Sequence, residues 1–123
     1  MACQRPALPR RMFALTAILA SLLVGCGSAL PPEHRLELSV AAGGGYSLTR
    51  LEIRRGEQVV ITFHNRDTVA HNLSIELPTG RRAVSAEPSV DAILNFPAND
   101  SGSFRFFCAV PGHTEAGVLV ISE

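Results

Sequence analysis

From residue 36 onward the sequence alternates between short runs of β-forming residues and clusters of turn residues. The runs are rich in β-branched and aromatic side chains, and they cover residues 36–40, 46–53, 58–65, 72–76, 92–96, 103–108 and 118–121. Glycine and proline fill the segments between them, and no stretch keeps a helical period. Seven short strands with this spacing predict an all-β fold, a Greek-key β-sandwich, rather than a parallel sheet.

The strand predicted at residues 58–65 shows the clearest alternation. Val59, Ile61 and Phe63 share one side of it, so we expect these side chains to face the core. His64 falls on the other side and is expected to face solvent as an ordinary structural histidine.

Two segments lack a regular pattern. The apolar side chains of residues 46–53 change from even to odd positions, which predicts a β-bulge near residues 49–50. Residues 80–90 show no strong alternation, and we predict a loop there.

The first 25 residues have the features of an export signal. Arg5, Arg10 and Arg11 precede an apolar run over residues 12–24, which is followed by small residues. This order is typical of a cleavable secretory signal peptide. As a helix the run would reach only ~20 Å, short of the ~30 Å hydrocarbon core of a bilayer, so we do not expect a permanent membrane span.

Residues 23–26 (Leu-Val-Gly-Cys) resemble a bacterial lipobox, in which the cysteine is acylated and becomes the mature N-terminus. We therefore predict that Cys26 is lipidated, with a plain cleavable leader as the alternative. A lipid there would tether the protein to a membrane outside the cytoplasm. Residues 26–35 are small and polar and contain two prolines, which predicts a flexible stalk, with His34 as an exposed histidine. Residues 36–123 are then the folded domain.

The charge excludes one broad class of partner. The full chain has 11 basic and 11 acidic residues. Loss of the first 25 residues removes three arginines and leaves 8 basic against 11 acidic residues, a net charge of −3. A protein that binds nucleic acid needs a basic face to neutralise phosphates, so we expect no nucleic acid partner.

The distribution of cysteines draws attention to Cys108. Cys3 leaves with the leader and Cys26 takes the lipid, so Cys108 is the only thiol of the predicted mature domain. A single cysteine cannot form a disulfide within its own domain. It is then either a reactive thiol without a role or a thiol with a chemical function. His113 follows beyond a Pro-Gly turn, which can bring both side chains to the same ion.

Thiolate and imidazole are soft ligands that suit copper, and two histidines with one cysteine form the blue-copper arrangement. The second histidine must come from elsewhere in the chain. His71 is the best placed, because it begins a predicted strand after a turn, whereas His34 lies in the stalk and His64 faces solvent. A nucleophilic cysteine–histidine pair is the competing use of these residues. The sequence supplies neither an orienting partner nor a substrate pocket for that use.

Two separated motifs carry a resemblance to a known family. The first consists of Gly56-x-x-Val59, Phe63-x-Asn65-x-Asp67 and His71-Asn72-Leu73-x-Ile75. The second consists of Gly102-x-Phe104-x-Phe106-Phe107-Cys108, Pro111-Gly112-His113 and Gly117-Val118-Leu119-Val120. In this order they resemble the central strands, the C-terminal ligand loop and the last strand of the cupredoxins. That family of blue, type 1 copper proteins includes plastocyanin, azurin and sulfocyanin.

The resemblance implies a Greek-key β-sandwich with one copper ion, cycling between Cu(I) and Cu(II), near one end. His71, Cys108 and His113 match the three equatorial ligands of the family. Asn72 follows the first ligand, as it often does in cupredoxins, where a nearby side chain helps to brace the cysteine loop.

The sequence departs from the family at the axial position. Many cupredoxins with this loop spacing carry a weak axial methionine four or five residues after the last histidine. Here those positions are Gly117 and Val118, and both methionines of the chain lie in the leader. We predict that Val118 replaces the methionine without coordinating. The site would then be more nearly trigonal, with a higher reduction potential than in a relative that has the methionine.

The alternative gives the vacant position to Glu115 or to a backbone carbonyl before His71. A carboxylate ligand would favour Cu(II), lower the potential and change the colour, as in the red copper protein nitrosocyanin. Considered on its own, Glu115 is expected to be an exposed loop acid.

Together these features predict an electron carrier and not an enzyme. The expected partners are redox proteins such as cytochromes and membrane oxidoreductases, and we expect a monomer tethered by its lipid outside the cytoplasm. Copper storage, delivery or sensing without electron transport is the alternative, which the missing methionine keeps open. A domain that has lost copper is a third reading, which the intact set of His71, Cys108 and His113 disfavours.

Overall fold

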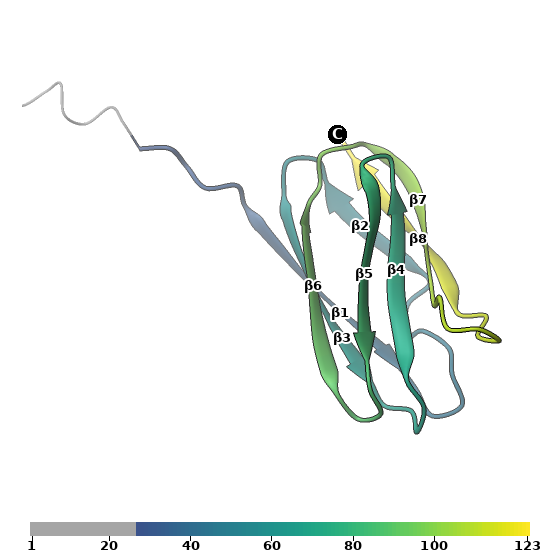
Figure 1. Cartoon of the computed structure of the whole chain (residues 1–123). Coiled ribbons are helices and arrows are strands. Elements are labelled where there is room, and N and C mark those ends of the chain that lie inside the picture. The colour runs from purple at the N-terminus through teal and green to yellow at the C-terminus, as the bar shows by residue number, and fades with distance from the viewer. Residues whose placement is uncertain (1–26) are drawn as a thin grey trace, which may run out of the picture. The chain divides into compact units, whose positions relative to one another are not determined.

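The structure, a computed structural model, describes residues 27–123. The predicted signal peptide (residues 1–25) and the predicted lipidation site, Cys26, lie outside these residues. Within them the fold is all-β, as predicted, and eight strands form two sheets (Figure 1). All eight strands belong to one unit, residues 31–123. No helix long and apolar enough to cross a membrane occurs among the described residues.

The smaller sheet has three strands in the order β1-β3-β6. They are β1 (Glu33–Val40), β3 (Gln58–Asn65) and β6 (Asp91–Pro97). Strand β1 runs parallel to β3, whereas β6 runs antiparallel to it. Because parallel neighbours need a crossover, the chain leaves this sheet after β1 and returns to it only with β3.

The larger sheet has five strands in the order β2-β8-β7-β4-β5. They are β2 (Arg50–Arg54), β8 (Ala116–Ser122), β7 (Gly102–Phe107), β4 (His71–Leu77) and β5 (Gly80–Ala86). Only the pair β2–β8 is parallel among the pairings of these described strands. Strands β7 and β4 are antiparallel neighbours. The segment that follows β7 and the segment that precedes β4 therefore meet at the same end of the sheet (Figure 1).

The core lies between the two sheets. Val59, Ile61 and Phe63 are fully buried, as their alternation predicted. They pack in one hydrophobic cluster with residues of the larger sheet such as Ile75 and Phe106. The sequence thus defines the inner faces of both sheets, and these faces orient the side chains at the end of the sandwich.

Two local predictions were wrong. Residues 80–86 form strand β5 and not a loop, because a two-residue turn after Leu77 returns the chain along β4 as a hairpin. This edge strand buries little, so its side chains show no alternation. Residues 46–53 form no bulged strand. Tyr46 bridges to Val40 of the smaller sheet, and β2 begins in the larger sheet only at Arg50.

The histidines outside the predicted site also differ from expectation. Strand β1 begins at Glu33, so His34 lies in the strand and not in a stalk, and its Nδ1 atom is 2.8 Å from Glu57 Oε2. His64 lies on the outer side of its strand, as predicted, but its side chain is only 19% exposed. Its Nδ1 atom is 2.9 Å from Asp91 Oδ1.

Candidate metal centre

The three histidine and cysteine side chains predicted as ligands come together at one end of the sandwich. His71 is the first residue of β4, and its side chain points inward and is 1% exposed. Cys108 directly follows β7, and His113 lies in the connection from β7 to β8. Because β4 and β7 are paired, their ends hold His71 and Cys108 close together although 36 residues separate them in the chain.

Backbone contacts shape the connection between β7 and β8. The Cys108 N–H donates to the carbonyl of Glu115 at 3.0 Å, and the His113 N–H donates to the carbonyl of Val110 at 3.1 Å. Gly112 has a φ of +84°, a conformation that few other residues adopt without strain. The connection is thus a closed loop that turns His113 back toward the thiol, as the Pro-Gly turn predicted.

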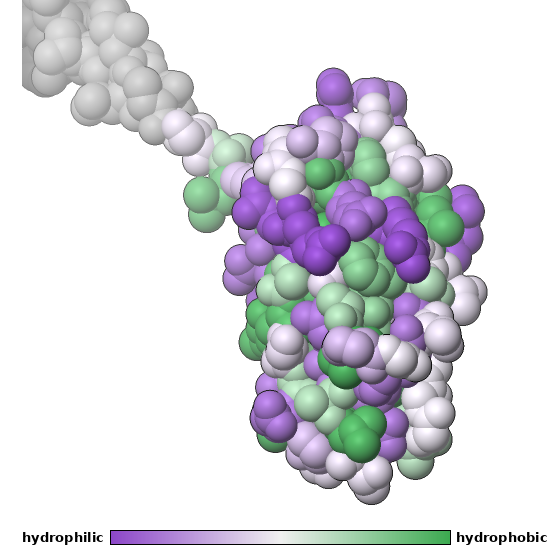
Figure 2. All heavy atoms as spheres, turned by 45° about the vertical axis from the view of Figure 1, so that its right-hand side comes forward, coloured by the Kyte–Doolittle hydropathy of each residue, from purple (hydrophilic) through white to green (hydrophobic). Residues whose placement is uncertain are grey.

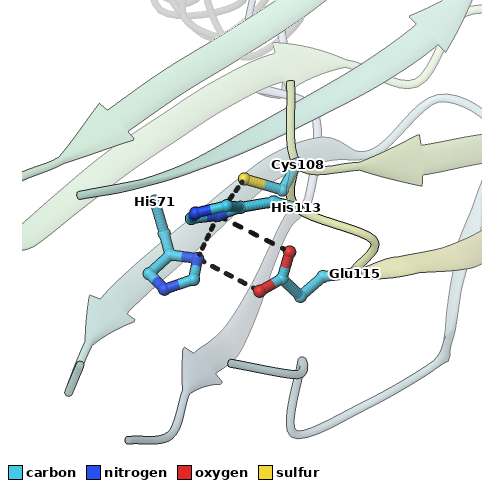
Figure 3. A group of neighbouring side chains, drawn as sticks. All are labelled: His71, Cys108, His113 and Glu115. Carbon is cyan, nitrogen blue, oxygen red and sulfur yellow. Dashed lines mark hydrogen bonds and ion pairs between the residues drawn. The ribbon is translucent and has the colours of Figure 1, made fainter. Parts of the chain in front are cut away.

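The donor atoms of four side chains converge (Figure 3). His113 Nδ1 lies 3.5 Å from Cys108 Sγ and 3.2 Å from His71 Nδ1. Glu115 Oε1 lies 3.3 Å from His71 Nδ1, and Glu115 Oε2 lies 3.8 Å from His113 Nδ1. One donor atom from each of these residues lies within 4.8 Å of every other. No other group of this kind is found among residues 27–123.

Glu115 is not the exposed loop acid that we expected. Its side chain is only 7% exposed, and its Oε2 atom is buried without a hydrogen-bond partner in the described part of the chain. Its Oε1 atom accepts a hydrogen bond from the backbone N–H of Gly45 at 3.3 Å. A buried carboxylate oxygen without a partner is costly, unless a cation or a proton satisfies it.

The structure does not support Val118 as the residue at the axial position. In β8, Leu119 and Ile121 face the core, so the alternation of the strand sends Val118 to the outer face, where it is 40% exposed. Gly117 faces inward instead, and a Cβ atom on it would lie 2.2 Å from the Phe106 ring. The acidic side chain that lies among the donors is Glu115, which was the alternative candidate.

The thiol is braced by the residue after the first histidine, as the family resemblance implied. The backbone N–H of Asn72 points to Cys108 Sγ at 3.3 Å. The side-chain oxygen of Asn72 accepts a hydrogen bond from the Ala109 N–H at 3.3 Å. Asn72 therefore ties strand β4 to both the sulfur atom and the backbone of the cysteine loop.

Asp67 is a functional residue that the sequence reasoning left without a role. Its Oδ2 atom lies 2.8 Å from Nε2 of His71, on the side of the imidazole ring away from the other donors. Its Oδ1 atom accepts hydrogen bonds from the backbone N–H groups of Thr68 and Gly43. The hydrogen bond from His71, followed by those from Thr68 and Gly43, lowers the pKa of Asp67 to about 2. Asp67 is therefore ionised at neutral pH.

Tyr46 contacts the strand that carries His71. Its hydroxyl donates to the carbonyl of Asn72 at 2.7 Å, and its ring packs against Phe63 and Phe106. Burial raises the pKa of Tyr46 far above its usual value, and electrostatic interaction with Cys108 and Glu115 raises it further. The phenol is therefore neutral, and it ties strand β4 to the aromatic core beside the group.

A cavity borders the group. A cavity of about 380 Å³ is lined by Asp67, His71, His113, Glu115 and residues 43–44, among others. Cys108 is not among its lining residues. The histidine and carboxylate donors thus face an open pocket, while the thiol is shielded by the strands.

The donor set fits one copper ion. Two nitrogen donors at ~2.0 Å from one tetrahedral ion lie ~3.3 Å apart, and the two Nδ1 atoms are 3.2 Å apart. Imidazole and thiolate are ligands that copper prefers, and a bound cation would satisfy the Glu115 oxygen that lacks a hydrogen-bond partner. When bound, copper supplies a one-electron Cu(I)/Cu(II) couple.

A comparison with protein families identifies the family of this chain. The model of the cupredoxin-like domain family matches residues 14–121. The chain belongs to this family. No curated protein shows significant sequence similarity to this cupredoxin.

Solved structures with the same fold include two auracyanins. Auracyanin A, a blue copper protein from the green thermophilic photosynthetic bacterium Chloroflexus aurantiacus, has a TM-score of 0.67 at 19% identity, over 73% of this chain and 99% of that chain. An auracyanin from the photosynthetic bacterium Roseiflexus castenholzii has a TM-score of 0.67 at 18% identity, over 79% of this chain and 100% of that chain. These matches confirm the predicted cupredoxin β-sandwich.

The fold also occurs inside larger enzymes. A Cu-containing nitrite reductase from Thermus scotoductus has a TM-score of 0.59 at 24% identity, over 73% of this chain but only 28% of that chain. This cupredoxin therefore corresponds to one part of such an enzyme and to the full length of an auracyanin. At these identities the likeness establishes the fold alone.

Proposed function

We propose that this cupredoxin is a one-electron carrier that holds a single copper ion through His71, Cys108 and His113, with Glu115 as the fourth ligand. The observation that carries the proposal is the convergence of four donor atoms within 4.8 Å of one another. These donors come from two paired strands and one closed loop, so the sandwich holds them in one arrangement. A ligand set that moves little between oxidation states favours rapid electron transfer.

The fourth ligand decides the electronic character of the proposed site. A carboxylate is a harder and more negative donor than a thioether, so it stabilises Cu(II) more than Cu(I). With Glu115 as ligand, we expect a reduction potential below that of a cupredoxin with an axial methionine. With Val118 at the axial position, the expectation was the reverse, a higher reduction potential. The colour should also move away from blue, toward that of a red copper site.

His113 is the proposed point of electron entry and exit. It is the most exposed of the four donors, with 21% of its side chain accessible. It lies on a loop with the exposed residues Ala109 and Pro111, next to which a partner can dock over a small apolar surface. Figure 2 shows that strongly hydrophilic residues gather in the upper half of the face turned forward, whereas paler and hydrophobic residues dominate its lower half.

The cellular setting follows from the sequence. A leader over residues 1–25 and a lipid on Cys26 would place this cupredoxin outside the cytoplasm and hold it near a membrane. Cytochromes and membrane oxidoreductases are the partners that a tethered carrier would meet there. We propose that it works as a monomer.

The visible spectrum tests the proposal. The purified protein is loaded with one equivalent of Cu(II), and its spectrum is recorded before and after ascorbate, beside a Cys108→Ser variant. An intense charge-transfer band that ascorbate bleaches and that Cys108→Ser lacks supports a copper–thiolate redox site. If the wild-type protein shows no such band and no tightly bound copper, the proposed function is wrong.

A second candidate is a copper-binding module for storage, delivery or sensing. The buried carboxylate of Glu115 favours it, because a site with strong preference for a divalent ion can hold that ion without exchanging electrons. Cyclic voltammetry separates the two functions. A carrier gives a reversible couple with fast electron exchange, whereas a storage or delivery module gives a slow or irreversible response and passes its ion to a chelator.

A further inference from the structure

Three consecutive glycines, residues 43–45, form a tight loop between β1 and β2 that borders the cavity of the metal centre. We call it the triglycine loop. Its residues have φ values of +90°, +90° and +91°, in the left-handed region that side chains disfavour. A turn needs one or two such residues, so a run of three indicates that this backbone does more than reverse the direction of the chain.

The first contact of the triglycine loop is with Asp67. The N–H of Gly43 donates to Asp67 Oδ1 at 3.2 Å, and the Thr68 N–H donates to the same oxygen at 2.7 Å. The Asp67 N–H donates to the buried side chain of Asn65. One oxygen of the carboxylate is thus fixed by backbone, which leaves Oδ2 to accept from Nε2 of His71 at 2.8 Å.

The second contact is with Glu115, 70 residues away in the chain. The N–H of Gly45 donates to Glu115 Oε1 at 3.3 Å. A Cβ atom on Gly44 would lie 2.8 Å from the same oxygen. The absence of a side chain at Gly44 therefore leaves room for the Glu115 carboxylate, and the Gly45 N–H holds it there.

The two carboxylates contact His71 on opposite sides of its ring. Asp67 faces Nε2, and Glu115 faces Nδ1 at 3.3 Å. An ionised carboxylate only accepts, so the contact with Asp67 keeps the proton on Nε2 and leaves the lone pair of Nδ1 directed at the other donors. Such an outer contact also increases the donor strength of the imidazole.

We propose that the triglycine loop and Asp67 form a clamp that positions both His71 and Glu115 for the metal. This inference rests on the proposed function, which it deepens. Asp67 and the glycines are positioning residues: they do not bind the ion, but they fix which ring nitrogen of His71 faces it and where the Glu115 carboxylate stands. Both effects favour the divalent ion, so the clamp strengthens Cu(II) binding over Cu(I).

Two alanine variants separate the clamp from the ordinary cost of a strained turn. Gly44→Ala and Gly45→Ala introduce a side chain at nearly the same φ, but only the Cβ atom at position 44 would meet Glu115. The Cβ atom at position 45 would have no neighbour within 4 Å in the described part of the chain. We expect Gly44→Ala to bind Cu(II) 10- to 100-fold more weakly than Gly45→Ala, the usual cost of losing a positioning contact. If Cu(I) binding is unchanged, each tenfold loss raises the potential by about 59 mV. Equal affinities and potentials in the two variants would overturn the role of the loop.

The contact with Asp67 has its own matched control. Asp67→Asn keeps the shape of the side chain but removes its charge, and Asp91→Asn does the same to a carboxylate that contacts His64 instead. Nitrogen NMR of the metal-free protein reads the His71 ring directly. We expect a protected Nε2–H proton in the wild type and in Asp91→Asn, and its loss in Asp67→Asn. An unprotected Nε2 in the wild type, or no change in Asp67→Asn, would overturn the positioning role.

A failure of the clamp can be distinguished from a failure of the proposed function. If the wild type binds copper with the expected spectrum but Gly44→Ala and Asp67→Asn match their controls, the clamp is wrong and the proposed function stands. If the wild type binds no copper, the proposed function is wrong. The NMR measurement on the metal-free protein then still decides whether Asp67 orients His71. Circular dichroism of all four variants confirms that each is folded.

Discussion

Two buried or half-buried histidines of this molecule form pairs with an aspartate, and only one pair belongs to the candidate metal centre. His71 Nε2 lies 2.8 Å from Asp67, and His64 Nδ1 lies 2.9 Å from Asp91. The contacts are nearly equal in length, and both aspartates have a lowered pKa, chiefly because of the hydrogen bond from the histidine. A histidine–carboxylate pair is therefore not by itself a sign of function here.

The difference lies at the other nitrogen of each ring. Nδ1 of His71 faces His113 at 3.2 Å and Glu115 at 3.3 Å inside the end of the sandwich. Within residues 27–123, Nε2 of His64 has only the exposed Glu37 at 3.9 Å, on the outer face of the smaller sheet. The comparison teaches that a carboxylate orients a histidine, and that the surroundings of the free nitrogen decide what the histidine can bind.

The largest expected effect comes from removing each histidine in turn. His71→Gln should abolish the copper–thiolate band, because it removes one of the soft donors that the site needs. His64→Gln should leave the band unchanged, since His64 does not belong to the group of converging donors. Absorption spectra of the copper-loaded variants measure the intensity of this band. A band of wild-type intensity in His71→Gln would contradict the proposed ligand set.

The next largest effect is expected from the glutamates that face the other ring nitrogen of each histidine. Glu115→Gln keeps the size of the side chain but removes its charge, so Cu(II) should be held at least tenfold less tightly and the potential should rise by about 59 mV or more. Glu37→Gln, on the exposed counterpart, should leave the potential at the wild-type value. Voltammetry of both proteins checks the contrast. A fall in the potential of Glu115→Gln would exclude a carboxylate ligand.

A smaller effect is expected in acid, in the metal-free protein. The pKa of Asp67 is lowered from 3.8 to about 2 on folding, so the unfolded chain takes up the proton first. The stabilisation is therefore complete above pH ~4 and is lost as the pH falls toward 2. The difference in unfolding free energy between wild type and Asp67→Asn should shrink over that window, as denaturant titrations at several pH values can show. A difference that stays constant from pH 6 to pH 2.5 would contradict this contribution.

The smallest effect is expected at Val118. Because this side chain lies on the outer face of β8, Val118→Met should leave the potential and the spectrum of the copper site nearly unchanged. The sequence alone predicted the opposite, a lower potential. Measuring the potential of this one variant thus distinguishes the sequence-based placement of the axial residue from the structural one.

Much of the fold could be predicted because burial leaves a clear pattern in the chain. The alternation of Val59, Ile61 and Phe63 identifies a strand with one buried face, and the structure agrees. Strand β5 could not be predicted, because an edge strand is held by backbone hydrogen bonds to β4 and buries few side chains. Backbone pairing is available to any sequence, so it leaves little trace in the residue pattern.

The convergence of His71, Cys108 and His113 could be predicted as well, because two imidazoles and one free thiol form a pattern typical of a metal site. Glu115 and Asp67 were harder. Acidic side chains are common on surfaces, and neither spacing nor composition shows that these two are held by backbone N–H groups from a distant glycine loop. The positions of His113 and Glu115 two residues apart were the only available signal, and burial decided the matter.

Three of the four donors, Cys108, His113 and Glu115, lie within one short connection whose ends are fastened to each other by a backbone hydrogen bond. Such a connection can change by mutation without disturbing the strands that carry it. Evolution could thus vary the donor set at this end of the domain by altering a few neighbouring codons. A protein engineer could likewise exchange the whole segment for that of a relative and keep the same scaffold.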